Sequence, residues 1–102
     1  MMSQEISTER ITVQLFGELD VVAAPRLEER LSQLRRDGAQ LITLDLSGME
    51  FVGAAGLSVF IGADQALRTT GGQLLLIRPT RVAGRVLAIT GLDTMLSVPC
   101  TQ

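Results

Sequence analysis

The sequence has no histidine, tryptophan, tyrosine or lysine, and only one cysteine in its 102 residues. Without histidine, Cys100 cannot form a thiol–imidazole pair, and the scattered acids show no spacing typical of metal ligands. A single cysteine also excludes a disulfide bond within the chain. We therefore expect no catalytic residue, no metal and no cofactor, and we interpret Cys100 as a small, partly buried residue near the end of the chain.

Aromatic residues and clusters of like charge are scarce as well. The three aromatic residues are all phenylalanine, and nine arginines against eleven acids give a net charge of −2. Such a composition provides neither a stacking platform for bases nor a basic stripe for phosphates. The apolar runs fall far short of the roughly 20 residues that span a bilayer, and the N-terminus has no signal pattern. We expect a cytoplasmic protein that binds no nucleic acid and does not insert into a membrane.

Apolar residues recur with alternating strand and helix periods along the whole chain. Strand patterns cover residues 11–17, 41–46, 74–77 and 95–98, and residues 1–10 suit a short edge strand. Helix patterns cover residues 25–37, 54–70 and 81–90. This alternation predicts crossover connections and a mainly parallel sheet. We expect one α/β domain over residues 1–102, with a four- to five-stranded mixed sheet and flanking helices.

The first expected helix has a signal at each end. Pro25 suits its first turn and Gly38 its end, with a stripe between them formed by Leu27, Leu31 and Leu34. Its charges suit the helix dipole, which favours acids in the first turn and bases in the last. We assign Glu28 and Glu29 to the first turn, and Arg35 and Arg36 to the last.

Similar signals mark the other two expected helices. Gly71 and Gly72 close the second one, whose core face we assign to Leu57, Phe60, Ile61 and Leu67. Thr80 can cap the third helix and Gly91 can end it. We assign the core face of that helix to Val82, Val86 and Ile89, and we expect Met49 and Met95 in the core.

The connection between the strand at residues 41–46 and the second helix is unusual. Its sequence, Phe-Val-Gly-Ala-Ala-Gly-Leu over residues 51–57, contains no Ser, Thr, Asp or Asn to cap the new helix. The loop also lacks the Lys and the Ser or Thr of a phosphate-binding P-loop. From the residues alone it is either a plain helix start or a docking surface with no polar groups to desolvate.

Three stretches of the chain resemble known motifs. They are Gly17-Glu18-Leu19-Asp20, the loop at residues 51–57, and Thr90-Gly91-Leu92 before the last strand pattern. In this order and spacing they resemble the STAS domain of the bacterial anti-sigma factor antagonist family, over residues 11–98. That family usually has an Asp-Ser-Ser-Gly-Leu type loop at residues 53–57. Its Asp and phosphoacceptor Ser fall on Gly53 and Ala54 here, and its next hydroxyl residue falls on Ala55.

The resemblance implies a protein-binding regulator. Such a protein sequesters an anti-sigma factor of the serine kinase-like type and thereby releases a sigma factor, and any ATP belongs to the partner. The implied contact surface comprises Glu18, Asp20, Val52, Gly53, Ala54, Ala55, Gly56, Leu57 and Ser58. Since Ala54 replaces the acceptor, the resemblance implies no switching by phosphorylation at that position.

Several alternatives stay open at this point. Glu18 and Asp20 could be solvated acids in a turn, without any partner. Ser47, expected in the turn before the second helix, and Ser58 could be displaced phosphoacceptors, or they could form local hydrogen bonds. The chain could also be a non-catalytic STAS subunit of a transport-associated or stress-signalling assembly, and a weak homodimer is compatible with either role.

Overall fold

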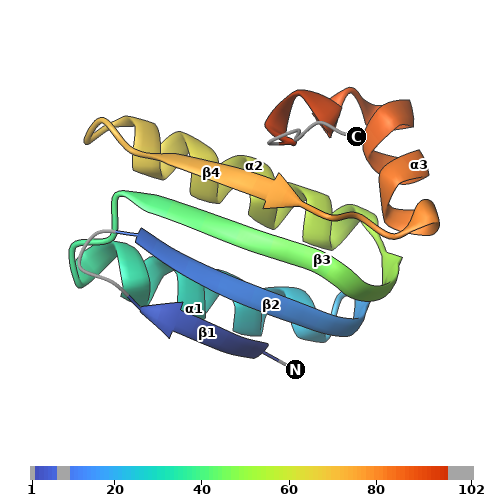
Figure 1. Ribbon diagram of the computed structural model, residues 1–102, viewed down its shortest axis with the longest axis horizontal. Coiled ribbons are helices and arrows are strands. Elements are labelled where there is room, and N and C mark those ends of the chain that lie inside the picture. Colours follow the sequence, from blue (N-terminus) through green and yellow to red (C-terminus); the bar gives the residue numbers. More distant parts are fainter. Residues whose placement is uncertain (1, 7–9, 97–102) are drawn as a thin grey trace.

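The structure, a computed structural model, describes residues 2–6 and 10–96. Four strands form one sheet in the order β1-β2-β3-β4 (Figure 1). β1 (Met2–Ile6) runs antiparallel to β2 (Arg10–Leu19), whereas β2, β3 (Leu41–Val52) and β4 (Gln73–Ile77) are parallel. The sheet is therefore mixed, with three parallel strands and one antiparallel edge strand.

Two helices cover one face of the sheet and a third lies near one end of it. α1 (Ala23–Arg36) and α2 (Ala54–Arg68) lie together behind the sheet in Figure 1, because each closes a parallel crossover. α3 (Arg81–Thr90) follows the carboxyl end of β4 and packs on β3 and on a short 3₁₀ helix, η1 (Leu92–Met95). The single α/β domain with flanking helices is as expected.

The expected last strand at residues 95–98 is wrong where the structure describes it. Leu92–Met95 forms η1, and Leu96 makes one isolated parallel bridge to Leu76 of β4. Residues 97 and 98 lie outside the described residues. Gly91, in the left-handed conformation with φ 78°, turns the chain directly from α3 into η1, so the strand pattern around Met95 does not form a ladder. The side chain of Met95 is half-buried against the core.

α1 begins earlier than the sequence predicts. It starts at Ala23 rather than Pro25, so Glu28 and Glu29 lie beyond its first turn, which holds no acid. Arg35 and Arg36 do lie in the last turn, and the helix ends before Gly38, whose φ is 101°. The early start has a specific cause, a carboxylate at Asp20 that is described below.

α3 has its expected bounds but presents a different face to the core. Thr80 caps it, because its Oγ1 accepts the N–H of Ala83 at 3.1 Å. Ala83 and Leu87 are buried, whereas Val82 is 50% and Ile89 is 77% exposed, so the expected core face is wrong. α3 carries apolar residues on two of its faces. The face of Ala83 and Leu87 is buried because it is the one that packs on β3 and η1.

β3 is twice as long as its sequence pattern predicts, and α2 is slightly shorter. The strand continues through Ser47 to Val52, so Ser47 lies in the strand and not in a turn. The pairing with β2 shifts register twice along this extension, which lets the strand bend without ending. α2 ends at Arg68 rather than residue 70. Phe60 and Leu67 are buried as expected, but Ile61 is 39% exposed, so its assignment to the core face is wrong.

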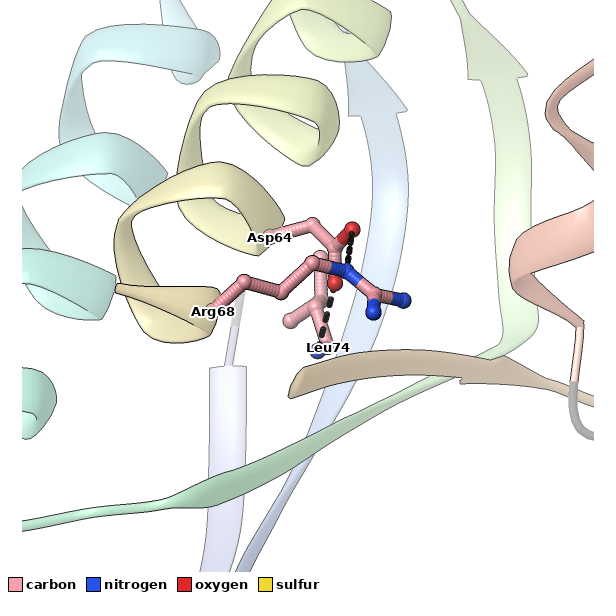
Figure 2. Close-up of polar contacts among 3 residues, drawn as sticks. All are labelled: Asp64, Arg68 and Leu74. Carbon is pink, nitrogen blue, oxygen red and sulfur yellow. Dashed lines mark hydrogen bonds and ion pairs between the residues drawn. The ribbon is translucent and has the colours of Figure 1, made fainter. Parts of the chain in front are cut away.

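A carboxylate on α2 fixes β4 to the helix layer. Asp64 Oδ1 accepts the N–H of Leu74 at 2.9 Å, and Asp64 Oδ2 accepts the Nε–H of Arg68 at 2.8 Å (Figure 2). The Leu74 N–H lies on the outer edge of the sheet, where an unpaired donor would be open to another strand. Asp64 satisfies it and so protects this edge. Within the described part of the chain, no helix is long and apolar enough to cross a membrane.

Candidate functional site

The carboxyl ends of β2 and β3 lie side by side. They bring together two of the three stretches on which the resemblance rests, residues 17–20 and 51–57. Glu18 pairs with Phe51 and Leu19 with Val52 in the parallel register. The Gly53 N–H then donates to the Leu19 carbonyl oxygen at 3.0 Å, which fixes the loop after β3 against the end of β2. The residues that the resemblance selects on these two segments therefore lie together, but Val52 and Gly56 are buried, and Glu18, Ala54 and Ser58 are the exposed members of the set.

Asp20 caps α1. Its Oδ1 accepts the N–H groups of Val22 at 3.1 Å and of Ala23 at 2.9 Å, while its carbonyl oxygen accepts the Ala24 N–H at 2.8 Å. The hydrogen bond from Ala23, supported by that from Val22, lowers the pKa of Asp20 below its ordinary value. Asp20 is thus more than a solvated turn residue, because it satisfies donors that the first helical turn leaves free. Glu18, in contrast, is exposed at the end of β2.

The start of α2 has no side-chain cap. Gly53 occupies the cap position with extended backbone angles of φ −95° and ψ 178°, and its carbonyl oxygen accepts the N–H groups of Gly56 and Leu57. Ala54 is exposed at the first helical position, and Ala55 is half-buried behind it. The helix start therefore presents backbone and methyl groups, with no side-chain hydroxyl or charge.

Gly56 has a packing role that explains its presence in this loop. A Cβ built on it would lie 2.6 Å from both Cγ and Cδ2 of Leu19, which is fully buried. The absence of a side chain lets α2 approach the end of β2 closely. The group that approaches Gly56 is thus a leucine of the same chain.

Large apolar side chains lie exposed around the carboxyl ends of β2 and β3, and the sequence analysis did not select them as site residues. Val21 is 74%, Val22 is 65% and Phe51 is 48% exposed. Glu50, also missed, is exposed beside Phe51 on the bulged part of β3. A signal was present: Val21 and Val22 fall outside the apolar stripe of Leu27, Leu31 and Leu34. We call this surface the β2–β3 rim, defined by Glu18, Asp20, Val21, Val22, Glu50, Phe51 and Ala54.

A shallow hollow continues the rim between the first turns of α1 and α2. Its volume is about 280 Å³, and its lining includes Val21, Ala24, Pro25, Ala55, Ser58 and Val59. The lining is largely aliphatic, and Ser58 and Glu28 are its polar members. This shape suits an apolar side chain of a partner better than a charged one.

The two serines considered as displaced phosphoacceptors lie in different environments. Ser58 is exposed on α2, next to the hollow. Ser47 is exposed on β3, and its N–H donates to Oδ1 of Asp45 at 3.0 Å. Neither serine lies at the exposed helix start itself, where Ala54 stands.

Asp45 is the buried charged residue of the described chain, and sequence reasoning missed it. Its Oδ2 forms an ion pair with the Arg78 guanidinium, which follows β4 in the left-handed conformation with φ 50°. Burial raises the pKa of Asp45, but hydrogen bonds from Arg78 and Ser47 outweigh it and hold the pKa below its ordinary value. This pair joins the middle of β3 to the residue that follows β4 and has the character of a structural link.

The arrangement suits binding rather than group transfer. Exposed acids, aliphatic side chains and a methyl-lined helix start offer no nucleophile paired with a base. Among residues 2–6 and 10–96, no cluster of three or more acids or cysteines could hold a metal ion. The rim instead combines apolar residues with acids, a composition typical of a protein-binding surface.

Comparisons with known proteins agree with this geometry. The chain matches the STAS domain family over residues 2–101. An anti-sigma-B factor antagonist of Staphylococcus aureus (strain NCTC 8325 / PS 47) is 35% identical over 86 residues, which cover 84% of this chain and 80% of that protein. Its counterpart in Staphylococcus epidermidis is 33% identical over the same length.

Solved structures show the same fold. The anti-sigma factor antagonist SpoIIAA in its unphosphorylated form superposes with a TM-score of 0.86 at 21% identity, over 94% of this chain and 85% of that one. An antagonist from Mycobacterium paratuberculosis gives a TM-score of 0.84 at 26% identity, over 99% and 86%. The resemblance carried by the three sequence stretches is thus confirmed, and this chain belongs to the STAS domain family, with bacterial anti-sigma factor antagonists among its relatives.

Proposed function

We propose that this protein is an anti-sigma factor antagonist that binds a serine kinase-like anti-sigma factor and so releases a sigma factor. The proposal rests on the backbone hydrogen bond between Gly53 and Leu19, because this bond holds the loop after β3 against the end of β2. Of the residues that the resemblance selects, the contact surface then comprises Glu18, Asp20, Gly53, Ala54, Ala55, Leu57 and Ser58, because Val52 and Gly56 are buried. The rim residues Val21, Val22, Glu50 and Phe51 extend it. The names of the relatives, anti-sigma-B factor antagonists, support the choice of partner.

The exposed apolar residues provide the driving force for such a complex. Removing a Val or Phe side chain fully from water stabilises by about 1.5 to 3 kcal/mol, so the partly exposed Val21, Val22 and Phe51 can together support a specific interface. Glu18 and Glu50 beside them select a partner with basic groups around an apolar centre. Ala54 brings no polar group that the partner would have to desolvate.

We further propose that the complex is not switched by phosphorylation at the start of α2. Residues 52–57 contain no hydroxyl group that could accept a phosphate. A phosphate there would add nearly two negative charges to a surface that already holds Glu18 and Asp20. Without it, the abundance of the protein sets how much anti-sigma factor is sequestered.

One experiment tests both parts of the proposal. The protein and an Ala54→Ser variant are each incubated with the anti-sigma factors of the same genome and ATP, and complex formation and intact mass are measured. We expect the wild type to bind and stay unmodified, and the variant to gain one phosphate and lose affinity. Phosphate on wild-type Ser47 or Ser58 would show that the switch has moved, and no binding to any anti-sigma factor would favour the accessory STAS subunit.

A further inference from the structure

The solvent side of α3 carries apolar and basic residues together. Val82 and Ile89 are exposed there, beside the exposed Arg81 and Arg85, whereas Ala83 and Leu87 face the core. Neither arginine forms an ion pair with a described residue, and residues 79–92 contain no acid. We call this surface the α3 face, defined by Arg81, Val82, Arg85 and Ile89.

The β2–β3 rim has the opposite charge and a similar apolar content. Glu18 and Glu50 are exposed beside Val21, Val22 and Phe51. The segments that build the rim contain no basic residue, since no arginine occurs in residues 11–25 or 37–67. The chain therefore carries two exposed apolar surfaces, one acidic and one basic.

Both surfaces lie at the same end of the molecule. The rim lies at the carboxyl ends of β2 and β3, and α3 follows the carboxyl end of β4 (Figure 1). A twofold axis between two copies can therefore place each α3 face on the rim of the other copy. Such a contact is isologous and closes at two subunits.

We propose that this protein forms an end-to-end dimer in which the α3 face of each copy binds the β2–β3 rim of the other. Charge selects this pairing, because rim on rim would bring Glu18 and Glu50 of two copies together, and α3 on α3 would bring together four arginines. Each crossed contact instead sets Arg81 and Arg85 against Glu18 and Glu50, with the exposed valines, Phe51 and Ile89 between them.

The dimer is a weak one that depends on concentration. Each crossed contact rests on a few apolar residues and two pairs of charges, which places the interface in the class of small, transient contacts. Provided that the proposed function is correct, the dimer covers the surface that binds the anti-sigma factor, so partner and second copy compete for the rim. Self-association would then limit activity in a chain that has no phosphate switch at Ala54.

Sedimentation velocity over a range of protein concentrations tests the dimer without any partner. We expect the wild type to pass from monomer to dimer, with weaker association at high salt. Arg81→Glu/Arg85→Glu and Glu18→Arg/Glu50→Arg should each weaken self-association at least tenfold. Arg30→Glu/Arg36→Glu on α1 changes the net charge as the first pair does and should leave association unchanged.

Mixing the two charge-reversed proteins provides the decisive measurement. In the heterodimer both crossed contacts again join opposite charges, so an equimolar mixture should recover the association that each variant has lost. A wild type that stays monomeric at every concentration overturns the proposal, as do a mixture without recovery or species that grow beyond the dimer. Circular dichroism of each variant shows that it is folded, and neither result depends on binding of an anti-sigma factor.

Discussion

Gly56 on α2 and Leu19 at the end of β2 are in such close contact that a Cβ on Gly56 would lie 2.6 Å from the leucine side chain. Leu19 is fully buried and also accepts the Gly53 N–H through its carbonyl oxygen. The position of the helix start, and with it the exposure of Ala54, therefore depends on this contact. A change that separates α2 from β2 would alter the candidate binding surface as well as the core.

Gly56→Ala should destabilise the protein by about 1 to 3 kcal/mol, since the added Cβ would force the fully buried Leu19 side chain to shift within the core. Gly62→Ala provides a matched control on the same helix, because no atom lies within 4 Å of a Cβ built there. The control should stabilise the helix by roughly 0.5 to 1 kcal/mol. Urea unfolding of both variants measures the difference, and equal stabilities would show that the close approach at Gly56 has no energetic consequence.

Ala54→Glu should weaken binding of the anti-sigma factor while the fold stays stable. An acid in the first turn of α2 suits the helix dipole, but it loses its hydration when an uncharged part of the partner covers it. We expect a loss of about 1.5 to 3 kcal/mol, roughly a ten- to hundredfold weaker complex. Calorimetric titration beside a thermal melt checks both quantities.

Ala54→Gln separates the charge of that substitution from its size. If both variants bind as tightly as the wild type while remaining folded, Ala54 lies outside the interface. If glutamine weakens binding as much as glutamate, shape rather than charge excludes the larger residue.

Asp20 calls for two substitutions because it caps α1 and also lies on the rim. Asp20→Asn keeps a good capping residue and removes the charge, whereas Asp20→Ala removes both. Alanine should lower Tm by roughly 4 to 8 °C, while asparagine should stay near the wild type. If the charge contacts a basic group of the partner, both variants lose affinity at low salt. Full affinity for Asp20→Asn would restrict Asp20 to its capping role.

The ion pair between Asp45 and Arg78 predicts how stability depends on pH. The folded pKa of Asp45 lies below its ordinary value of 3.8, so its contribution is complete above that pH and is lost as pH falls through the folded pKa. Arg78→Ala leaves the buried carboxylate without its cation. The variant should therefore be less stable at neutral pH, and the difference should shrink on acidification as Asp45 takes up a proton.

Thermal melts between neutral and acid pH check this dependence. Arg26→Ala is the control, because Arg26 is exposed and has no ion pair with a described residue. A stability difference for Arg78→Ala that stays constant over the whole range would show that the pair with Asp45 does not contribute. Asp20, whose pKa is also lowered, titrates equally in the wild type and in both variants, so it cancels from the comparison.

The sequence by itself determined the fold class, the order of strands and helices as far as α3, and most helix ends. These features depend on local chemistry: the periods of apolar residues, Thr80 as a cap, and glycines at positive φ such as Gly38 and Gly91. The resemblance of three stretches to known motifs selected two of the loops, and the parallel pairing of β2 with β3 in the structure places these loops at one edge of the sheet. The absence of a hydroxyl group in residues 52–57 needed no structure at all.

Tertiary structure decided which apolar residues became core and which became surface. α3 has two apolar faces, and the sequence pattern does not distinguish between them. Packing on β3 and η1 buries Ala83 and Leu87 and leaves Val82 and Ile89 exposed to solvent. The sites of Asp45 and Asp64 depend in the same way on partners 33 and 10 residues away, Arg78 and Leu74. A sequence pattern shows the period of a helix or strand, but it does not show which other element packs against it. The exposure of a residue depends on that packing.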